Sequence, residues 1–180
     1  MSLTSHASQH TVIHDVWQAL DGLTDPEIPV VTLREMGIIR DVEHVADNAV
    51  VVVITPTYSG CPAMEQIHDD ICSTVQALGL HVQVRTQLAP AWTTDWMSDV
   101  AKDKLKAYGI APPNRQCGAP SQQTSVVHFM RKPLQPEQAV ECPHCGSHHT
   151  FESSHFGSTA CKALYKCMDC QEPFDYFKPY

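Results

Sequence analysis

Four cysteines close to the C-terminus constrain this chain more than any other feature. They form two Cys-x-x-Cys pairs, Cys142 with Cys145 and Cys167 with Cys170, and 21 residues separate the pairs. Two such pairs at this spacing are typical of a zinc ribbon, in which four thiolates surround Zn²⁺ as a tetrahedron. Gly146 follows the first pair and permits the backbone conformation that such a turn needs. We expect a structural zinc, because four sulfur ligands leave no open position for water or substrate.

Three of the four other cysteines are expected to have no chemical role of their own or only an auxiliary one. Cys161 lies six residues before Cys167 and is expected to be a small buried residue beside the zinc site, with an exchanging fifth ligand as the alternative. Cys72 lies in the middle of a predicted helix and is expected to point into the hydrophobic core. Cys117 is interpreted as a spare thiol, or else as an auxiliary ligand for a transient metal. The alternative for the four paired cysteines is a set of reduced structural thiols or a redox dithiol, but the paired spacing favours zinc.

Length and hydropathy limit the class of protein. The chain has 180 residues, which is enough for one domain of ordinary size and a small metal-stabilised one. It has no apolar run of about 18 residues. Residues 1–11 are polar and do not show the basic segment followed by an apolar segment that is typical of a signal peptide. We therefore expect a cytoplasmic protein that is not inserted in a membrane, with its cysteines in a reducing compartment.

The charge distribution argues against nucleic acid as a partner. The formal net charge is −8, and residues 1–110 carry six Lys/Arg against fourteen Asp/Glu. Residues 139–180, which hold the paired cysteines, carry three basic against five acidic residues. A ribbon without a basic stripe has little with which to neutralise phosphates.

The N-terminal half predicts alternating helices and strands. Apolar residues recur at helical spacing over 12–23, and the two prolines in Asp25–Val30 then impose a loop that carries two carboxylates. Residues 37–45 and 49–55 are β-branched runs around a short polar turn, which predicts a hairpin. The second run is apolar on both faces, so we expect it at the centre of the sheet.

A loop with a cysteine follows that central strand. Met64, Ile67, Ile71 and Val75 predict a helix that stops at Gly79. We expect Cys61 at the N-cap and Pro62 at the first helical position, where the positive end of the helix dipole favours a thiolate. Cysteine is a poor structural cap, so this pattern favours a functional thiol over a small buried cap.

Residues 80–88 alternate as a half-exposed strand, and a last helix reaches Gly109. Trp92 and Trp96 precede that helix and are interpreted as core residues or as a partner-binding surface. The sequence thus predicts an α+β fold: a small layered domain over 12–110 with a three-stranded sheet and flanking helices, a proline-rich linker over 111–138, and a zinc ribbon over 139–180.

Several motifs resemble known families. The metal-sulfur cluster assembly domain of SufT-like proteins is similar to this chain over about residues 12–110, through the runs Asp25–Val30, Gly37–Ile39 and Thr55–Ala63. The chain as a whole resembles the PaaD family, also called PaaJ, an accessory subunit of the bacterial phenylacetyl-CoA oxygenase (epoxidase) system. The further motifs that carry this second resemblance are Pro90–Met97, Phe156–Cys167 and Pro173–Lys178.

The PaaD resemblance implies an accessory role in aerobic phenylacetate degradation. The chain lacks the repeated Glu-x-x-His motif of di-iron sites and a Gly-x-Gly-x-x-Gly fingerprint, so neither the oxygenase nor the reductase of that system is expected. The resemblance implies help in maturing an iron-sulfur or iron centre of a partner, especially the iron-sulfur reductase. Cys61 would hold metal, sulfur or a transient cluster, and Asp25 and Glu27 would shape the pocket beside it.

Two alternatives and the oligomeric state stay open. Cys61 could serve as a nucleophile in thioester or redox chemistry, which would need a neighbouring base that the sequence does not identify. The chain could instead be a non-catalytic scaffold that binds oxygenase subunits through the ribbon and the surface of Trp92 and Trp96. A homodimer is also open.

Overall fold

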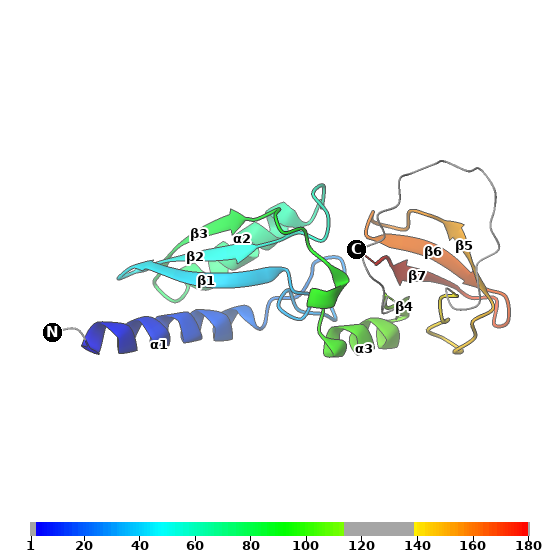
Figure 1. The fold of residues 1–180 in the computed structure, drawn as a ribbon, viewed down its shortest axis with the longest axis horizontal. Helices are drawn as coiled ribbons and strands as arrows, with labels where there is room; N and C mark the ends of the chain where they lie inside the picture. Colours follow the sequence, from blue (N-terminus) through cyan, green and yellow to red (C-terminus); the bar gives the residue numbers. More distant parts are fainter. Residues whose placement is uncertain (1–2, 114–138, 180) are drawn as a thin grey trace. The chain divides into compact units, whose positions relative to one another are not determined.

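The structure, a computed structural model, describes residues 3–113 and 139–179 (Figure 1). These residues divide between Tyr108 and Gly109 into two compact units. The N-terminal unit contains a three-stranded sheet with helices, and the C-terminal unit contains a four-stranded sheet with the paired cysteines. The predicted α+β class with a three-stranded sheet is confirmed. Cys117 and most of the predicted linker 111–138 lie outside the described residues.

The three-stranded sheet has the order β1-β2-β3. Strands β1 (Ile39–Ala46) and β2 (Ala49–Ile54) form the predicted antiparallel hairpin, and β3 (His81–Thr86) pairs with β2 in parallel. Two adjacent parallel strands need a long crossover connection between them, which is usually a helix. Helix α2 (Met64–Gln76) is that connection here. Every residue from Val50 to Ile54 is at most 7% exposed, so the prediction of a central strand is confirmed.

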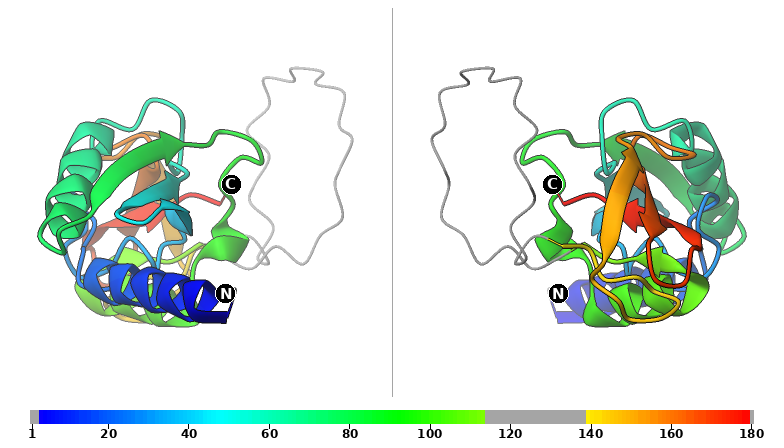
Figure 2. Two further views of the ribbon diagram at one scale, coloured as in Figure 1. Left: turned by 90° about the vertical axis from the view of Figure 1, so that its left-hand side faces the viewer. Right: turned by 90° about the vertical axis from the view of Figure 1, so that its right-hand side faces the viewer.

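Two helices cover this sheet (Figures 1 and 2). Helix α1 (Leu3–Leu20) packs against β1 and α2 through residues that include the buried Val16 and Leu20, and α2 packs against β3. Ile67, Ile71 and Val75 are buried at a spacing of four, as an amphipathic helix requires. The sequence predicts Cys72 in the core, but this residue is only half-buried because it points beside the apolar stripe.

The segment after β3 packs against residues just before β1 and at its start. Trp92 is 3% exposed, and its indole N–H donates to the carbonyl of Met36 at 2.9 Å, so this tryptophan belongs to the core. Trp96 ends the short 3₁₀ helix η1 (Thr94–Trp96) and lies half-buried under the guanidinium of Arg40, 3.5 Å from its ring centroid. The Ser98 hydroxyl caps helix α3 (Asp99–Tyr108) by accepting the backbone N–H of Ala101.

The C-terminal sheet has the order β4-β7-β6-β5. Strands β5 (Thr150–Ser154), β6 (Lys162–Cys167) and β7 (Pro173–Phe177) are antiparallel, and β4 (Ile110–Ala111) pairs with β7 in parallel. Ile110 therefore belongs to this sheet and not to the end of the N-terminal domain, where the sequence places it. A two-residue strand shows no periodicity by which to predict it. The buried cluster of this unit is Ala111, Val140, Cys142, Ala163, Tyr165, Cys167, Phe174 and Tyr176.

Within the described ranges 3–113 and 139–179, no helix combines the length and the apolar character that crossing a membrane requires.

Candidate functional site

The paired cysteines meet at one end of the C-terminal sheet. The sulfur atoms of Cys142, Cys145, Cys167 and Cys170 all lie within 4.8 Å of one another. The Cys142 and Cys170 sulfurs are 3.8 Å apart, and those of Cys145 and Cys167 are 3.6 Å apart. These separations are far longer than a disulfide bond. Sulfurs about 2.3 Å from a tetrahedral zinc would be about 3.8 Å apart, so the four thiols have the spacing that zinc requires.

Two similar turns position the thiols. In the first turn the N–H of Gly146 donates to the carbonyl of Cys142, and Gly146 has a φ of 75°. In the second turn Gln171 follows Cys170 with a φ of 64°. Both turns thus place a left-handed residue directly after their second cysteine. The first is the predicted glycine, whereas the second uses a residue type in which this conformation is uncommon.

Hydrogen bonds prepare the second turn for a metal. The backbone N–H of Cys170 donates to the Cys167 sulfur at 3.5 Å and is the largest influence on that thiol. Together with the N–H of Asp169 it outweighs the opposing effect of burial and lowers the pKa of Cys167 to about 7. Only the thiolate binds metal, so these N–H groups favour the ligand form of Cys167. The pKa of Cys170 in the same turn is raised, because burial and the neighbouring Cys167 and Cys145 thiols disfavour its thiolate.

The two turns are also joined to each other around the sulfur cluster. The hydroxyl of Ser147 donates to the Asp169 carboxylate, and the Nδ1 atom of His149 lies 3.2 Å from the same carboxylate. These contacts orient the ligand-bearing turns from outside, in the way that outer-shell groups support metal sites. The sequence did not predict these contacts, because Ser147 and His149 lie about 20 residues before Asp169 and only the folded chain brings the two turns together.

Cys161 lies outside the sulfur cluster, which among the described residues contains only the paired cysteines. It immediately precedes β6, whose other end carries Cys167. Six residues of extended strand span about 20 Å, so Cys161 cannot exchange with the four thiols without refolding the strand. Its half-buried sulfur lies 3.0 Å from the hydroxyl of Thr159.

Cys61 lies in the loop that connects β2 to α2, but it does not cap the helix. Its carbonyl accepts the N–H of Met64 at 3.4 Å, whereas the helix begins at Met64 with Ala63 as its N-cap. The predicted N-cap position is therefore wrong by two residues. Proline suits the second position of a turn as well as the first position of a helix, so Pro62 did not distinguish the two. Cys61 is half-buried.

Asp25 and Glu27 have different environments. Asp25 is 9% exposed, and its Oδ1 atom accepts the backbone N–H groups of Glu27 at 2.8 Å and Ile28 at 3.0 Å. This carboxylate holds its own loop in shape, whereas Glu27 is exposed. Among the described residues, Asp25, Glu27 and Cys61 are not gathered into a group of three metal-ligating side chains.

A small pocket adjoins the Cys61 loop, and we name it the Thr55 pocket. It has a volume of about 250 Å³ and is lined by residues 55–59 on one side and by Leu88, Ala91 and Trp92 on the other. The residues before α2 and those after β3 thus meet around one cavity. Sequence periodicity placed these segments in separate loops and gave no sign that they meet.

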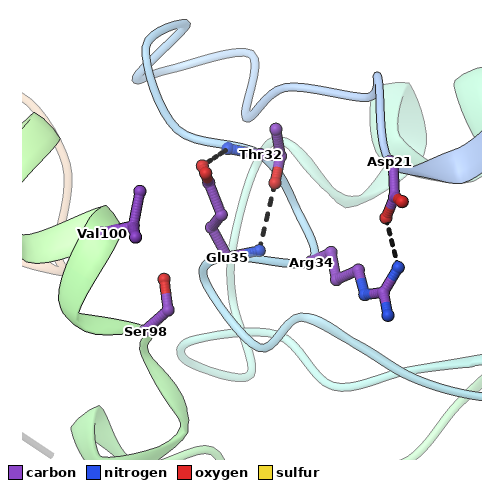
Figure 3. A pocket seen from close by; sticks show the side chains of 6 residues that line it. All are labelled: Asp21, Thr32, Arg34, Glu35, Ser98 and Val100. Atoms are coloured by element: carbon purple, nitrogen blue, oxygen red, sulfur yellow. Dashed lines mark hydrogen bonds and ion pairs between the residues drawn. The ribbon is translucent and has the colours of Figure 1, made fainter.

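A second, more open depression of about 490 Å³ lies between the end of α1 and the start of α3 (Figure 3). Its charged groups are paired: Arg34 donates to Asp21, and the Glu35 carboxylate accepts Lys104 Nζ at 2.7 Å. Glu35 and Thr32 also bond each other reciprocally, backbone N–H to side-chain oxygen. These polar groups stabilise the loop before β1, and they are engaged with one another rather than directed at a ligand.

Glu35 supplies a pH-dependent part of the stability. Burial acts to raise the pKa of its carboxyl, but the hydrogen bond and charge of Lys104 and the N–H of Thr32 outweigh burial and lower that pKa. A carboxyl whose pKa is lower in the folded than in the unfolded protein stabilises the fold at pH values above its unfolded pKa. This stabilisation is lost as the pH falls through the folded pKa. We expect Glu35→Gln to reduce the free energy of unfolding by about 0.5–1 kcal/mol at neutral pH, since Lys104 is partly exposed.

This loss should shrink to nothing between about pH 5 and about pH 3. Urea denaturation across this range, with the exposed Glu65 changed to Gln as a control for the lost charge, measures it. An equal loss at every pH would contradict the assigned pairing.

Two family models match the chain. The model of the PaaD zinc beta ribbon domain matches residues 127–178, and that of an iron-sulfur cluster assembly protein matches residues 13–86. The first covers all four paired cysteines, and the second covers Asp25, Glu27 and Cys61.

Individual proteins are similar over larger spans. A protein of Escherichia coli (strain K12) that is assigned as a component of 1,2-phenylacetyl-CoA epoxidase is 46% identical over 92% of either chain. An Fe-S protein maturation auxiliary factor of Porphyromonas gingivalis (strain ATCC BAA-308 / W83) is 35% identical over 51% of this chain and 88% of its own. A domain of unknown function from Bacillus anthracis, DUF59, has a TM-score of 0.52 at 27% identity and covers 56% of this chain and 96% of its own.

Proposed function

Because the chain belongs to the PaaD family of 1,2-phenylacetyl-CoA epoxidase components, we propose that it is an accessory subunit of such an epoxidase that assists maturation of an iron-sulfur or iron centre. The observation that carries the proposal is the 46% identity over 92% of both chains, which spans the cluster-assembly domain and the ribbon together. Its partners are then the other subunits of the epoxidase. We further propose the iron-sulfur reductase as the subunit that is served.

In this proposal Cys61 is the residue that handles the cargo. A thiolate is the ligand type that iron-sulfur chemistry prefers, and this thiol is half-buried in the turn-rich loop that follows the central strand β2. Asp25 is assigned a supporting role, because its carboxylate already accepts two backbone N–H groups. Glu27 is the exposed carboxylate of that loop and is the better candidate to meet an incoming metal.

The ribbon is assigned a structural metal. Cys142, Cys145, Cys167 and Cys170 are proposed as zinc ligands, supported by their mutual sulfur distances. Zinc in such a shell supplies folding energy and has no open position for catalysis. The ribbon carries an acidic balance, which argues for a protein partner rather than for nucleic acid.

Cys61→Ser tests the maturation role. Serine keeps the size of the side chain but is a much weaker ligand for iron, so the iron and sulfide content of the co-expressed reductase should fall to the level found without this protein. Iron and acid-labile sulfide per reductase chain measure the effect. Cys161→Ser is the matched control, since Cys161 is another half-buried thiol outside the sulfur cluster and should leave the content unchanged.

The same variant separates the alternatives. Unchanged iron content in Cys61→Ser would remove this thiol from maturation. If epoxidase turnover and co-purification also survived, a scaffold role would replace the proposal. Hydrolysis of a CoA thioester by the isolated protein, lost in Cys61→Ser, would favour a cysteine-dependent enzyme.

A further inference from the structure

Helix α2 carries a thiol and an imidazole one turn apart, outside its buried stripe. The Cys72 sulfur lies 3.8 Å from Nδ1 and 4.0 Å from Nε2 of His68. Residues four apart are neighbours on one face of a helix, so the backbone itself brings these two side chains together. The His68 side chain is 50% exposed and Cys72 is half-buried, so the pair lies at the surface of the N-terminal unit.

The separation of these atoms suits two ligands of one metal ion. Zinc binds a thiolate at about 2.3 Å and an imidazole nitrogen at about 2.0–2.1 Å, so tetrahedral bond angles place sulfur and nitrogen about 3.6 Å apart. Both distances from the Cys72 sulfur to the His68 ring are close to this value, and the exposed ring has room to rotate. Two ligands four residues apart on a helix also hold zinc in the His-Glu-x-x-His motif.

Asp69 supports His68 from outside the pair. Its Oδ1 atom lies 3.3 Å from Nδ1 of His68. A carboxylate at this position favours the tautomer with the proton on Nδ1, which leaves the lone pair of Nε2 for a metal, and histidine ligands commonly have such a partner. Among the described residues, no third ligating side chain completes a group of three here. The other positions of an ion would therefore be filled by water or by another molecule.

The properties of the thiol favour metal binding over other chemistry. Burial and the charge of Asp69 raise the pKa of Cys72, so the neutral thiol predominates near pH 7 in the absence of metal. Nucleophilic attack and oxidation need the thiolate, whereas a metal ion displaces the proton as it binds. Mg²⁺ and Ca²⁺ prefer oxygen ligands, but imidazole and thiolate together suit zinc and similar first-row ions.

We propose that His68 and Cys72 form a second metal site, which binds one Zn²⁺ or a similar divalent first-row ion through His68 Nε2 and the Cys72 sulfur. With two protein ligands the ion stays accessible and exchanges with solution, unlike an ion in the closed shell of the ribbon. The site is on the helix that follows the loop of Cys61, and it does not depend on the maturation role of that thiol.

The zinc content of the full chain tests this site. Equilibrium dialysis against buffered zinc should fill the ribbon first and should load a second zinc per chain at higher free zinc. Cys72→Ser and His68→Gln should each weaken the second step by at least about 100-fold, since even an outer-shell partner typically contributes 10–100-fold. The first step should not change. In cadmium-loaded protein, ¹¹³Cd NMR should show one signal from four sulfurs and a separate signal from the mixed site.

Further variants make the outcomes distinct. Cys72→His places two histidines at the same spacing and should keep the second zinc. Cys72→Ser combined with Ser73→Cys keeps the number of thiols but moves one by about 100° around the helix, so it should lose that zinc. Cys61→Ser should bind both ions normally, which separates failure of this site from failure of the maturation role. A second zinc that persists in Cys72→Ser, returns with the shifted thiol, disappears in Cys61→Ser or never binds would overturn the proposal.

Discussion

Replacing Cys167 with serine is expected to abolish zinc binding and to unfold the C-terminal sheet. Cys167 is fully buried, ends β6 and belongs to the buried cluster of its unit. The unit is small, and structural zinc in comparable domains contributes roughly 10 kcal/mol or more of folding free energy at neutral pH. Zinc content per chain and hydrogen exchange of residues 150–177 measure the two effects. The N-terminal unit should keep its protection.

Cys161→Ser is the matched control for this experiment. It removes a thiol from the other end of the same strand, at a position outside the sulfur cluster, so zinc and exchange protection should stay at normal levels. Zinc retained in Cys167→Ser, or lost in Cys161→Ser, would contradict the assigned ligand set.

Gly37→Ala is expected to destabilise the N-terminal unit strongly. Gly37 has a φ of 69°, and a Cβ added there would lie 2.7 Å from the carbonyl oxygen of Trp96 and 2.8 Å from its Cβ. The neighbouring atoms are backbone or close to it and cannot rotate away. Backbone strain and overpacking together predict a loss of about 3 kcal/mol in the free energy of unfolding, measured by urea denaturation of the N-terminal unit in the full chain.

Two further glycines separate these contributions. Gly79 has a φ of 77° with no atom within 4 Å of an added Cβ, so Gly79→Ala should show the backbone cost alone, about 1 kcal/mol. Gly22 also has open space and shows no left-handed φ, so Gly22→Ala should change stability by less than about 0.5 kcal/mol. If Gly37→Ala cost no more than Gly79→Ala, close packing against Trp96 would be refuted.

Much of the N-terminal fold follows from local sequence patterns. The hairpin and the central position of β2 were predictable because Val50–Ile54 is apolar on both faces, and α2 because its apolar residues recur every four positions. Local patterns could not give β4, which is too short for a period and acquires its conformation from pairing with β7. They also misplaced Cys61, since proline favours a turn and a helix start for the same reason, its fixed φ.

The candidate sites differ in the same way. The paired cysteines carry their chemistry in their spacing, and the structure brings all four sulfurs together as the spacing predicts. The Thr55 pocket has no such signature. A threonine after a strand is ordinary, and the pocket exists only because the fold places Leu88, Ala91 and Trp92 opposite residues 55–59.

Strand β4 bears on how this protein can be divided. Ile110 and Ala111 precede residues 114–138 in the chain, yet they complete the sheet whose other strands begin at Thr150. A ribbon expressed from residue 139 onward would leave one edge of β7 unpaired and would open the cluster that Ala111 helps to close. A fragment ending at residue 113 would carry that strand away without its partner. Gly109 is therefore the natural starting point for an independent ribbon.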